Sequence, residues 1–196
     1  MPEHLSSVGR LRALWALVSA DYPSYDLLLP GDPAFICQPQ SCDAWCCRNL
    51  SVPLDDRELA RLAHASGRQV VDLVELEDGR PIRLPLAQPF LLARADNHCA
   101  HLGDSLGCSV YDGRPGACRL YPHQVLVIDP ETGRPLHTSP SAARVAGRAL
   151  IADQSSAAVP LLLRHTACPG FTAPPLDEAA WARLLTETIA LQFPLE

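Results

Sequence analysis

Four cysteines stand within eleven residues, in the run Cys-Gln-Pro-Gln-Ser-Cys-Asp-Ala-Trp-Cys-Cys at positions 37–47. The whole chain has eight cysteines in 196 residues, well above background but below the density of a small secreted disulfide scaffold. The N-terminus lacks the basic segment of a secretory signal, and the apolar run at residues 13–18 is shorter than a signal core. We therefore expect a cytoplasmic protein, where clustered thiols hold metal more often than they form disulfides.

Length and charge narrow the range of partners. A chain of 196 residues with 47% apolar residues is expected to form one domain with a substantial core. The net charge of -6 argues against a nucleic-acid partner and against a membrane surface, because phosphate binding needs a clustered positive field. No stretch approaches the ~20 apolar residues of a membrane-spanning helix. All 16 basic side chains are arginine, which excludes a catalytic lysine and indicates a GC-rich bacterial source.

Two helices are predicted in the first third of the chain. Ser6 or Ser7 is a candidate cap for a helix that runs to about residue 20. Asp55 and Glu58 form a capping box that opens a second helix, and Gly67 is expected to stop it. The first helix is expected to pack one apolar face on the core, formed by Val8, Leu11, Leu14, Trp15 and Val18.

Further elements are predicted downstream. Residues 141–152 predict a helix of small residues, and Asp177 is a candidate cap for an amphipathic helix that ends at Gln192. The turn at residues 78–81 is expected to join two short strands. Residues 21–39 contain several prolines and predict an irregular loop. Strand patterns occupy residues 82–86, 89–93, 124–128 and 157–163.

These elements predict the α+β class, as a small irregular single domain with helices and short strands around a loop-borne cysteine metal site. An N-terminal helix and a proline-rich lead-in take residues 1–34. The cysteine-cluster metal-binding domain takes residues 35–170. Residues 171–196 are expected to add a C-terminal helix that packs on the same domain.

The thiols fall into three groups along the chain. Metal ligation needs deprotonated sulfurs that converge on one point, and the turn-rich sequence around the first two groups allows such convergence. A lone cysteine such as the last one is, taken by itself, as often a buried small hydrophobe as a ligand. The candidate metal ligands are Cys37, Cys42, Cys46 and Cys47, then Cys99, Cys108 and Cys118, and finally Cys168.

Cys46 and Cys47 are adjacent, which raises the question of one centre or two. Neighbouring side chains point about 100° apart on a helix and to opposite faces of a strand. One tetrahedral ion is therefore expected to take both only seldom. Two four-thiolate centres and a single centre with structural or redox spares fit the sequence equally well.

The arginines beside the thiols and the spacing of the cysteines do not identify the metal. Arg48, Arg114 and Arg119 adjoin the thiols and could offset the formal charge near minus two of a four-thiolate centre with zinc or with an oxidised four-iron cluster. The absence of a C-x2-C knuckle gives a slight preference for iron–sulfur over zinc. Three histidines could each replace a thiolate, although chance placement explains them better: His98, His101 and His123.

The segment Arg-Pro-Gly-Ala-Cys-Arg-Leu-Tyr-Pro at residues 114–122 resembles the R-P-x-x-C-R-x-[FY]-P signature of the YkgJ-like cysteine-cluster family, described as zinc- or iron-chelating domains. Residues 35–47, 98–102 and 108–111 are also similar to that family, and Cys168 looks like its trailing cysteine. The first cluster has x4 and x3 spacings in place of the commoner C-x2-C-x2-CC. This looser spacing is closer to the cysteine segment of flagellin lysine methylases, which are considerably longer.

The resemblance implies that Cys168 is a ligand and that Arg114 and Arg119 lie beside the metal. It supplies no reaction and no catalytic residue. The first hypothesis is an iron–sulfur protein that holds a 4Fe-4S cluster and has a redox or electron-transfer role with a protein redox partner. If it is an enzyme, the expected class is an iron–sulfur oxidoreductase. The alternatives are a structural zinc-binding interaction module and a protein-modifying enzyme distantly similar to the methylases.

Overall fold

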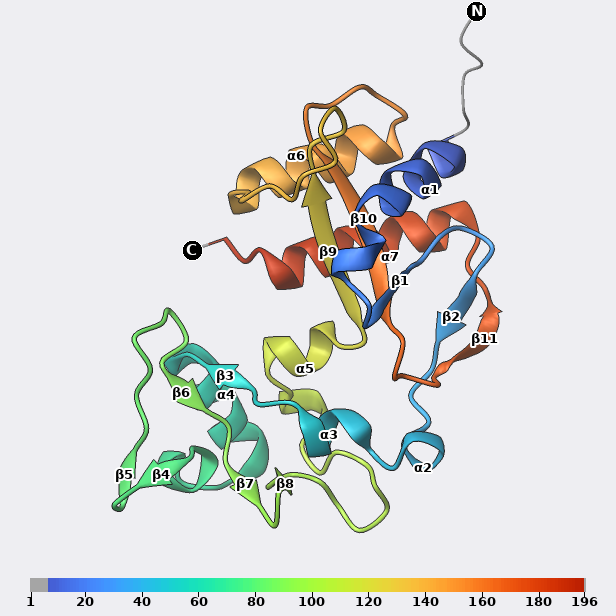
Figure 1. Ribbon diagram of the computed structural model, residues 1–196. Coiled ribbons are helices and arrows are strands. Elements are labelled where there is room, and N and C mark those ends of the chain that lie inside the picture. Colours follow the sequence, from blue (N-terminus) through green and yellow to red (C-terminus); the bar gives the residue numbers. More distant parts are fainter. Residues whose placement is uncertain (1–6, 196) are drawn as a thin grey trace, which may run out of the picture. The chain divides into compact units, whose positions relative to one another are not determined.

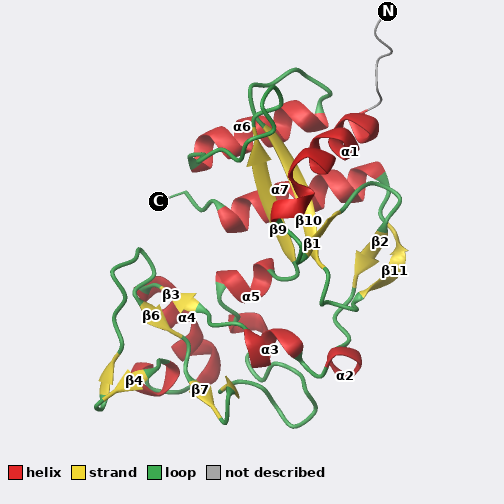
Figure 2. Ribbon diagram, viewed as in Figure 1, coloured by secondary structure: helices red, strands yellow, loops and turns green. Residues whose placement is uncertain are grey.

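The computed structural model describes residues 7–195, which fold into two compact units (Figure 1). Within the described residues, the split unit comprises residues 7–37 and 122–195, and the cysteine unit comprises Gln38–Tyr121. Helices alternate with short antiparallel strands in both units (Figure 2), which confirms the predicted α+β class. The domain limits expected from the sequence stay a prediction.

A three-stranded antiparallel sheet forms the centre of the split unit. Its strand order is β1 (Tyr25–Leu27), β10 (Val159–His165) and β9 (His123–Ile128). The helices of this unit are α1 (Ser7–Val18), α6 (Pro140–Ile151) and α7 (Glu178–Gln192), and η1 (Ser19–Asp21) is a short 3-10 turn. The sheet is buried because β10 is apolar throughout its centre, where Leu161, Leu162 and Leu163 are fully buried.

Side chains of α7 tie this helix to the polypeptide around the sheet. The indole Nε1 of Trp181 donates to the carbonyl oxygen of Leu28 at 2.8 Å. The side-chain amide of Gln192 accepts from Val125 N and donates to Val125 O, both at 2.7 Å. Since β9 is an edge strand, this amide satisfies backbone groups that no further strand pairs.

A two-stranded sheet completes the split unit. It pairs β2 (Pro33–Phe35) with β11 (Phe171–Pro175). Ile36 N donates to Gly170 O at 2.8 Å, directly beyond the ladder. A Cβ at Gly170 would lie 2.6 Å from the Ile36 carbonyl oxygen, so only glycine allows this approach.

The cysteine unit has its own core, distinct from the one around the central sheet. Leu54, Leu62 and Leu73 are fully buried in it. Three partly buried thiols pack against this core, those of Cys99, Cys108 and Cys118. The elements of the unit are α2 (Pro39–Cys42), α3 (Trp45–Asn49), β3 (Pro53–Leu54), α4 (Asp56–Ser66), η2 (Val70–Leu73), β4 (Leu76–Glu77), β5 (Arg80–Pro81), β6 (Phe90–Leu91), β7 (Arg94–Ala95), β8 (His98–Cys99), η3 (Tyr111–Gly113) and α5 (Gly116–Leu120).

Local signals predicted the helices well. The side chain of Asp55 accepts from Glu58 N at 2.7 Å, Glu58 reaches back to Asp55 N, and Gly67 ends α4 in the left-handed region, as predicted. Asp177 caps α7 through Ala180 N at 2.6 Å. Helix α1 begins at Ser7 and presents the predicted face, whereas Ser6 lies outside the described residues.

Strand predictions were less accurate. The predicted loop at residues 21–39 was wrong in part, because it contains β1 and β2, which pair with segments more than 130 residues away in sequence. The strand predicted at residues 82–86 is wrong, since that segment has no ladder partner in the described structure. Of the strand predicted at residues 89–93, only β6 is present. Strands β9 and β10 confirm the strands predicted at residues 124–128 and 157–163, and β4 and β5 confirm the hairpin around residues 78–81.

No helix within residues 7–195 is both long enough and apolar enough to cross a membrane.

Candidate metal centre

Two short helices carry three cysteines of the first cluster, Cys42, Cys46 and Cys47. Asp43 ends α2 and Ala44 precedes α3, with φ values of 48° and 51°. Two successive left-handed residues without a glycine are costly, at about 1 kcal/mol or more each, so the surrounding fold must hold this bend. The bend separates Cys42 on α2 from Cys46 and Cys47 on α3.

Cys99 is carried by a hairpin that the sequence reasoning did not recognise. Strands β7 and β8 pair Arg94 with Cys99, and their turn residues Asp96 and Asn97 have φ values of 48° and 64°. Two positive φ values are typical of the type I′ turn of a two-residue hairpin, in which Asp and Asn are common. The Asp-Asn dipeptide was therefore a signal that could have revealed it.

Cys108 and Cys118 approach from two further segments. Cys108 forms an isolated bridge with Leu102, and Cys118 lies in the middle of α5. The first amide of α5, Gly116 N, donates to the Glu58 carboxylate at 2.6 Å. Glu58 is 8% exposed, and it connects the start of α5 to the start of α4.

Aromatic stacking links α3 and α5. The rings of Trp45 and Tyr121 lie 6.0 Å apart with an interplanar angle of 18°. Trp45 is the first residue of α3, beside Cys46, and Tyr121 follows the last residue of α5. Helices of five residues are not stable in isolation, so contacts of this kind must hold the two segments.

Five thiols of this unit influence one another electrostatically, those of Cys46, Cys47, Cys99, Cys108 and Cys118. Burial raises the pKa of the Cys118 thiol to about 12, and the negative charges of neighbouring thiolates, Cys99 first, add to this effect. Burial also raises the pKa of Cys99. A hydrogen bond from His101 N to the Cys99 sulfur, at 3.4 Å, acts in the opposite direction and lowers it. Sulfurs from α3, β8, the Cys108 bridge and α5 are thus brought together.

The thiols of Cys46 and Cys47 form a close pair. Their Sγ atoms lie 4.0 Å apart. A hydrogen bond between the two side chains lowers the pKa of Cys46 to about 7, and the positive charge of Arg114 contributes in the same direction. The same hydrogen bond raises the pKa of Cys47. The hydrogen bond therefore favours the thiolate form of Cys46 over that of Cys47.

This donor set matches the chemistry of soft metal ions. Thiolates are the ligands of zinc and of iron–sulfur clusters, and positive charge beside them offsets their repulsion. Within residues 7–195, no three His, Cys, Asp or Glu side chains lie close enough together to hold one ion. The sulfurs would therefore have to draw together to bind one ion, and the elements that carry them are short helices, a two-residue hairpin turn and an isolated bridge.

The predicted arginines take different places. Arg114 stacks on Tyr111, with its Cζ 3.8 Å from the ring centroid, and its charge acts on Cys46 and Cys118. Arg48 instead pairs with Asp43, where its Nε lies 3.3 Å from the carboxylate. Arg119 is exposed on α5. Sequence reasoning missed Arg94, whose charge acts on Cys99.

The remaining three cysteines lie on other elements of the chain than these five. The Cys42 thiol lies 3.6 Å from Pro39 O within α2. Cys37 ends the first segment of the split unit, just beyond β2, and Cys168 shortly precedes β11. Because β2 and β11 are antiparallel and pair Phe35 with Phe171, both cysteines belong to the same end of this small sheet. Their role as ligands stays a prediction.

The three candidate histidines differ in setting. His98 Nδ1 lies 3.0 Å from Cys99 O. His101 is 4% exposed, and burial lowers its pKa. His123 belongs to the split unit, where it packs edge-on against Phe35 and Phe171, and burial lowers its pKa to about 4. A neutral imidazole is a competent ligand, but neither burial nor ring packing directs these rings to a metal.

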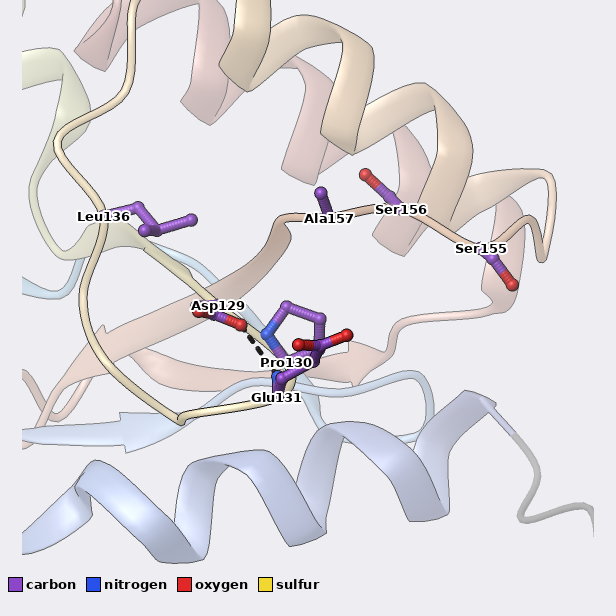
Figure 3. Close-up of a pocket in the computed structure, with 7 residues that line it drawn as sticks. All are labelled: Asp129, Pro130, Glu131, Leu136, Ser155, Ser156 and Ala157. Atoms are coloured by element: carbon purple, nitrogen blue, oxygen red, sulfur yellow. Dashed lines mark hydrogen bonds between the residues drawn. The ribbon is translucent and has the colours of Figure 1, made fainter.

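The split unit has a surface pocket whose lining residues come from chain segments without cysteines. Figure 3 shows that its lining comes from the turn after β9 and from the segment before β10. The Asp129 carboxylate accepts hydrogen bonds from Glu131 N at 2.8 Å and from the Thr132 hydroxyl at 2.9 Å. Its oxygens are thus used within their own turn, and the seven labelled lining residues include no cysteine.

Comparison with known proteins identifies a family. A sequence model of the CxxCxxCC family, described as "Putative zinc- or iron-chelating domain", matches residues 36–142. Neither the curated proteins nor the solved structures gave a significant match. The match covers more than half of the chain and includes every cysteine except Cys168. The chain therefore belongs to the CxxCxxCC family of zinc- or iron-chelating domains, as its resemblance to the YkgJ-like proteins had indicated.

Proposed function

We propose that the cysteine unit binds an iron–sulfur cluster, of the four-iron type, through the thiolates of Cys46, Cys99, Cys108 and Cys118. The observation that carries this proposal is that Cys99, Cys108 and Cys118 pack against one core while the charge of Cys46 on α3 acts on Cys99 and Cys118. Four thiolates are the ligand set of such clusters. The family description names both zinc and iron, and the absence of a C-x2-C knuckle gives a slight preference for iron.

Cys47 has a different role in this proposal. With Cys46 bound to the cluster as a thiolate, the Cys47 thiol would be the donor of the hydrogen bond between the two side chains. Hydrogen bonds to ligand sulfurs tune the potential of iron–sulfur clusters. Five neighbouring thiols thus divide into four ligands and one donor, which corresponds to a single centre with a spare thiol.

A bound cluster would supply one-electron chemistry. The protein's own contribution is to hold the four sulfurs, to offset their charge with Arg94 and Arg114, and to limit solvent access by burial of Cys99 and Cys118. We infer an electron-transfer role in the cytoplasm with a protein redox partner.

Anaerobic purification tests the proposal. We expect bound iron and acid-labile sulfide in equal amounts, at about four of each per chain, with broad charge-transfer absorption in the visible range. Exposure to air should bleach this absorption. Protein that is purified anaerobically with neither iron nor sulfide would overturn the proposal.

One observation favours zinc as the second candidate. The 4.0 Å between the sulfurs of Cys46 and Cys47 is close to the edge of a tetrahedral zinc–thiolate site, about 3.8 Å for a Zn–S bond of about 2.3 Å. In this case both cysteines bind one ion, and the unit is a zinc-stabilised interaction module. It predicts a colourless protein with stoichiometric zinc that unfolds when a chelator is added.

A further inference from the structure

Arg94 connects two chain segments that carry cysteines. Its guanidinium donates to the carbonyl oxygens of Leu50 at 2.9 Å and Arg48 at 2.6 Å, and to that of Asn97. The first two carbonyls lie at the C-terminal end of α3, and the third lies in the turn of the β7–β8 hairpin. One side chain therefore bridges the helix of the adjacent thiols and the hairpin of Cys99.

The carbonyls at the end of α3 need such a partner. The last four carbonyls of a helix have no partner within the helix, and α3 has only five residues. Such a helix has few internal hydrogen bonds, so its position depends on contacts from outside. Arg94 bonds two of these carbonyls and thereby fixes the end of the helix.

The hairpin gives Arg94 a direct relation to Cys99. The two residues are paired across the β7–β8 ladder, so movement of one is transmitted to the other. Asn97, the third partner, has a φ of 64°, and its carbonyl is oriented by the tight turn. The guanidinium thus contacts both the base and the turn of the structure that presents Cys99.

We propose that Arg94 is a positioning residue that holds Cys46 and Cys47 on α3 at a fixed distance from Cys99 on β8. This inference deepens the proposed function and rests on it for its biological meaning. Arginine suits the task because its planar group offers five N–H donors in a fixed fork, whereas lysine has one mobile ammonium. Groups that orient metal ligands typically change metal affinity about 10–100-fold when they are mutated.

Zinc affinity of the full-length reduced protein, measured by chelator competition, tests the proposal with Zn²⁺ as the probe ion. We expect Arg94→Ala to weaken binding about 10–100-fold. Arg94→Lys should weaken it nearly as much, because it keeps the charge but cannot span three carbonyls. The matched control is Arg80→Ala, at an exposed arginine on β5 in the same unit, which should bind zinc like the wild type.

A second measurement does not depend on metal. A short bifunctional thiol reagent, followed by peptide mapping, reports the proximity of Cys46 or Cys47 to Cys99 in the metal-free protein. We expect the crosslinked yield to fall several-fold in both Arg94 variants, at a temperature where circular dichroism shows that they are folded. If Arg94→Ala is unfolded, Arg94→Lys provides the measurement.

The outcomes separate the two proposals. Wild-type affinity and crosslinking in a folded Arg94→Lys variant would overturn the role of Arg94, because charge alone would then suffice. A wild-type protein that crosslinks efficiently but binds neither iron nor zinc would overturn the proposed function. In that case the loss of crosslinking in the variants would still support the positioning role.

Discussion

The sulfurs of Cys46 and Cys47 lie 4.0 Å apart on α3, although the two residues are adjacent in the chain. Side chains about 100° apart on a helix usually diverge. Here the two thiols turn toward each other and form a hydrogen bond, which lowers the pKa of Cys46 and raises that of Cys47. The pair is thus one local unit, in which Cys46 loses its proton more easily than Cys47.

Serine substitution at each position distinguishes the two roles. In Cys46→Ser we expect nearly complete loss of iron, because a ligand is removed. In Cys47→Ser we expect the iron content to be retained and the reduction potential to change, since a hydroxyl replaces the S–H donor. The measurements are iron and sulfide analysis with anaerobic redox titration. Equal and complete metal loss from both variants would instead indicate that both sulfurs bind, as in the zinc site.

Glu58 should be important for stability and for the position of Cys118. Its buried carboxylate accepts from Gly116 N and from the side-chain amide of Gln88, at 2.6 and 3.0 Å. We expect Glu58→Ala to lower the free energy of unfolding by about 2–4 kcal/mol, because two partly buried donors lose their acceptor. Urea unfolding measures this change. Glu77→Ala, at an exposed site on β4, is the control and should stay within about 0.5 kcal/mol of the wild type.

The metal-free protein should lose stability in alkaline solution. The pKa of Cys118 is raised in the folded state from 9.0 to about 12, so the folded protein holds this proton more tightly than the unfolded chain. Its contribution is complete below pH 9 and is lost as the pH rises toward 12. From pH 8 to pH 11 we expect a loss of about 3 kcal/mol from this thiol. Thermal unfolding across this range measures it, and Cys118→Ala should flatten the dependence. An unchanged slope in that variant would contradict the assignment.

Gly113 is required by packing rather than by backbone conformation. A Cβ added at this position of η3 would collide with the Cβ of Ala65 on α4. We expect Gly113→Ala to destabilise the protein by about 1–3 kcal/mol, because the two elements must separate. The double variant Gly113→Ala with Ala65→Gly restores the space. Its loss of stability should be smaller than the sum of the two single losses, and additivity would contradict the clash.

The helices could be predicted because their signals are local. The capping box at Asp55 and the cap at Asp177 each act within three residues, and both are present in the structure. The strands β1 and β2 were missed because each has three residues and pairs with a distant segment. Short strands gain their stability from partners, and the sequence contains no sign of which partner they take.

For the thiols, too, some features could be predicted from local sequence and others depended on contacts between distant segments. The spacing of the cysteines and the segment around Cys118 were enough to indicate a metal-chelating family, which the family match confirms. Arg48 was predicted to offset charge at the metal. In the structure its guanidinium forms an ion pair with Asp43. Arg94 was missed because its partners are backbone carbonyls, which leave no pattern in the sequence.

The sequence by itself determined the chemistry: eight thiols, no lysine, well-capped helices and a family of zinc- or iron-chelating domains. Only the tertiary structure decided which thiols meet. It brings Cys99, Cys108 and Cys118 against one core beside Cys46 and Cys47, and it places Cys37 and Cys168 at one end of a separate sheet. The physical reason is that ligand residue types are a local property, whereas their convergence depends on packing between segments far apart in the chain.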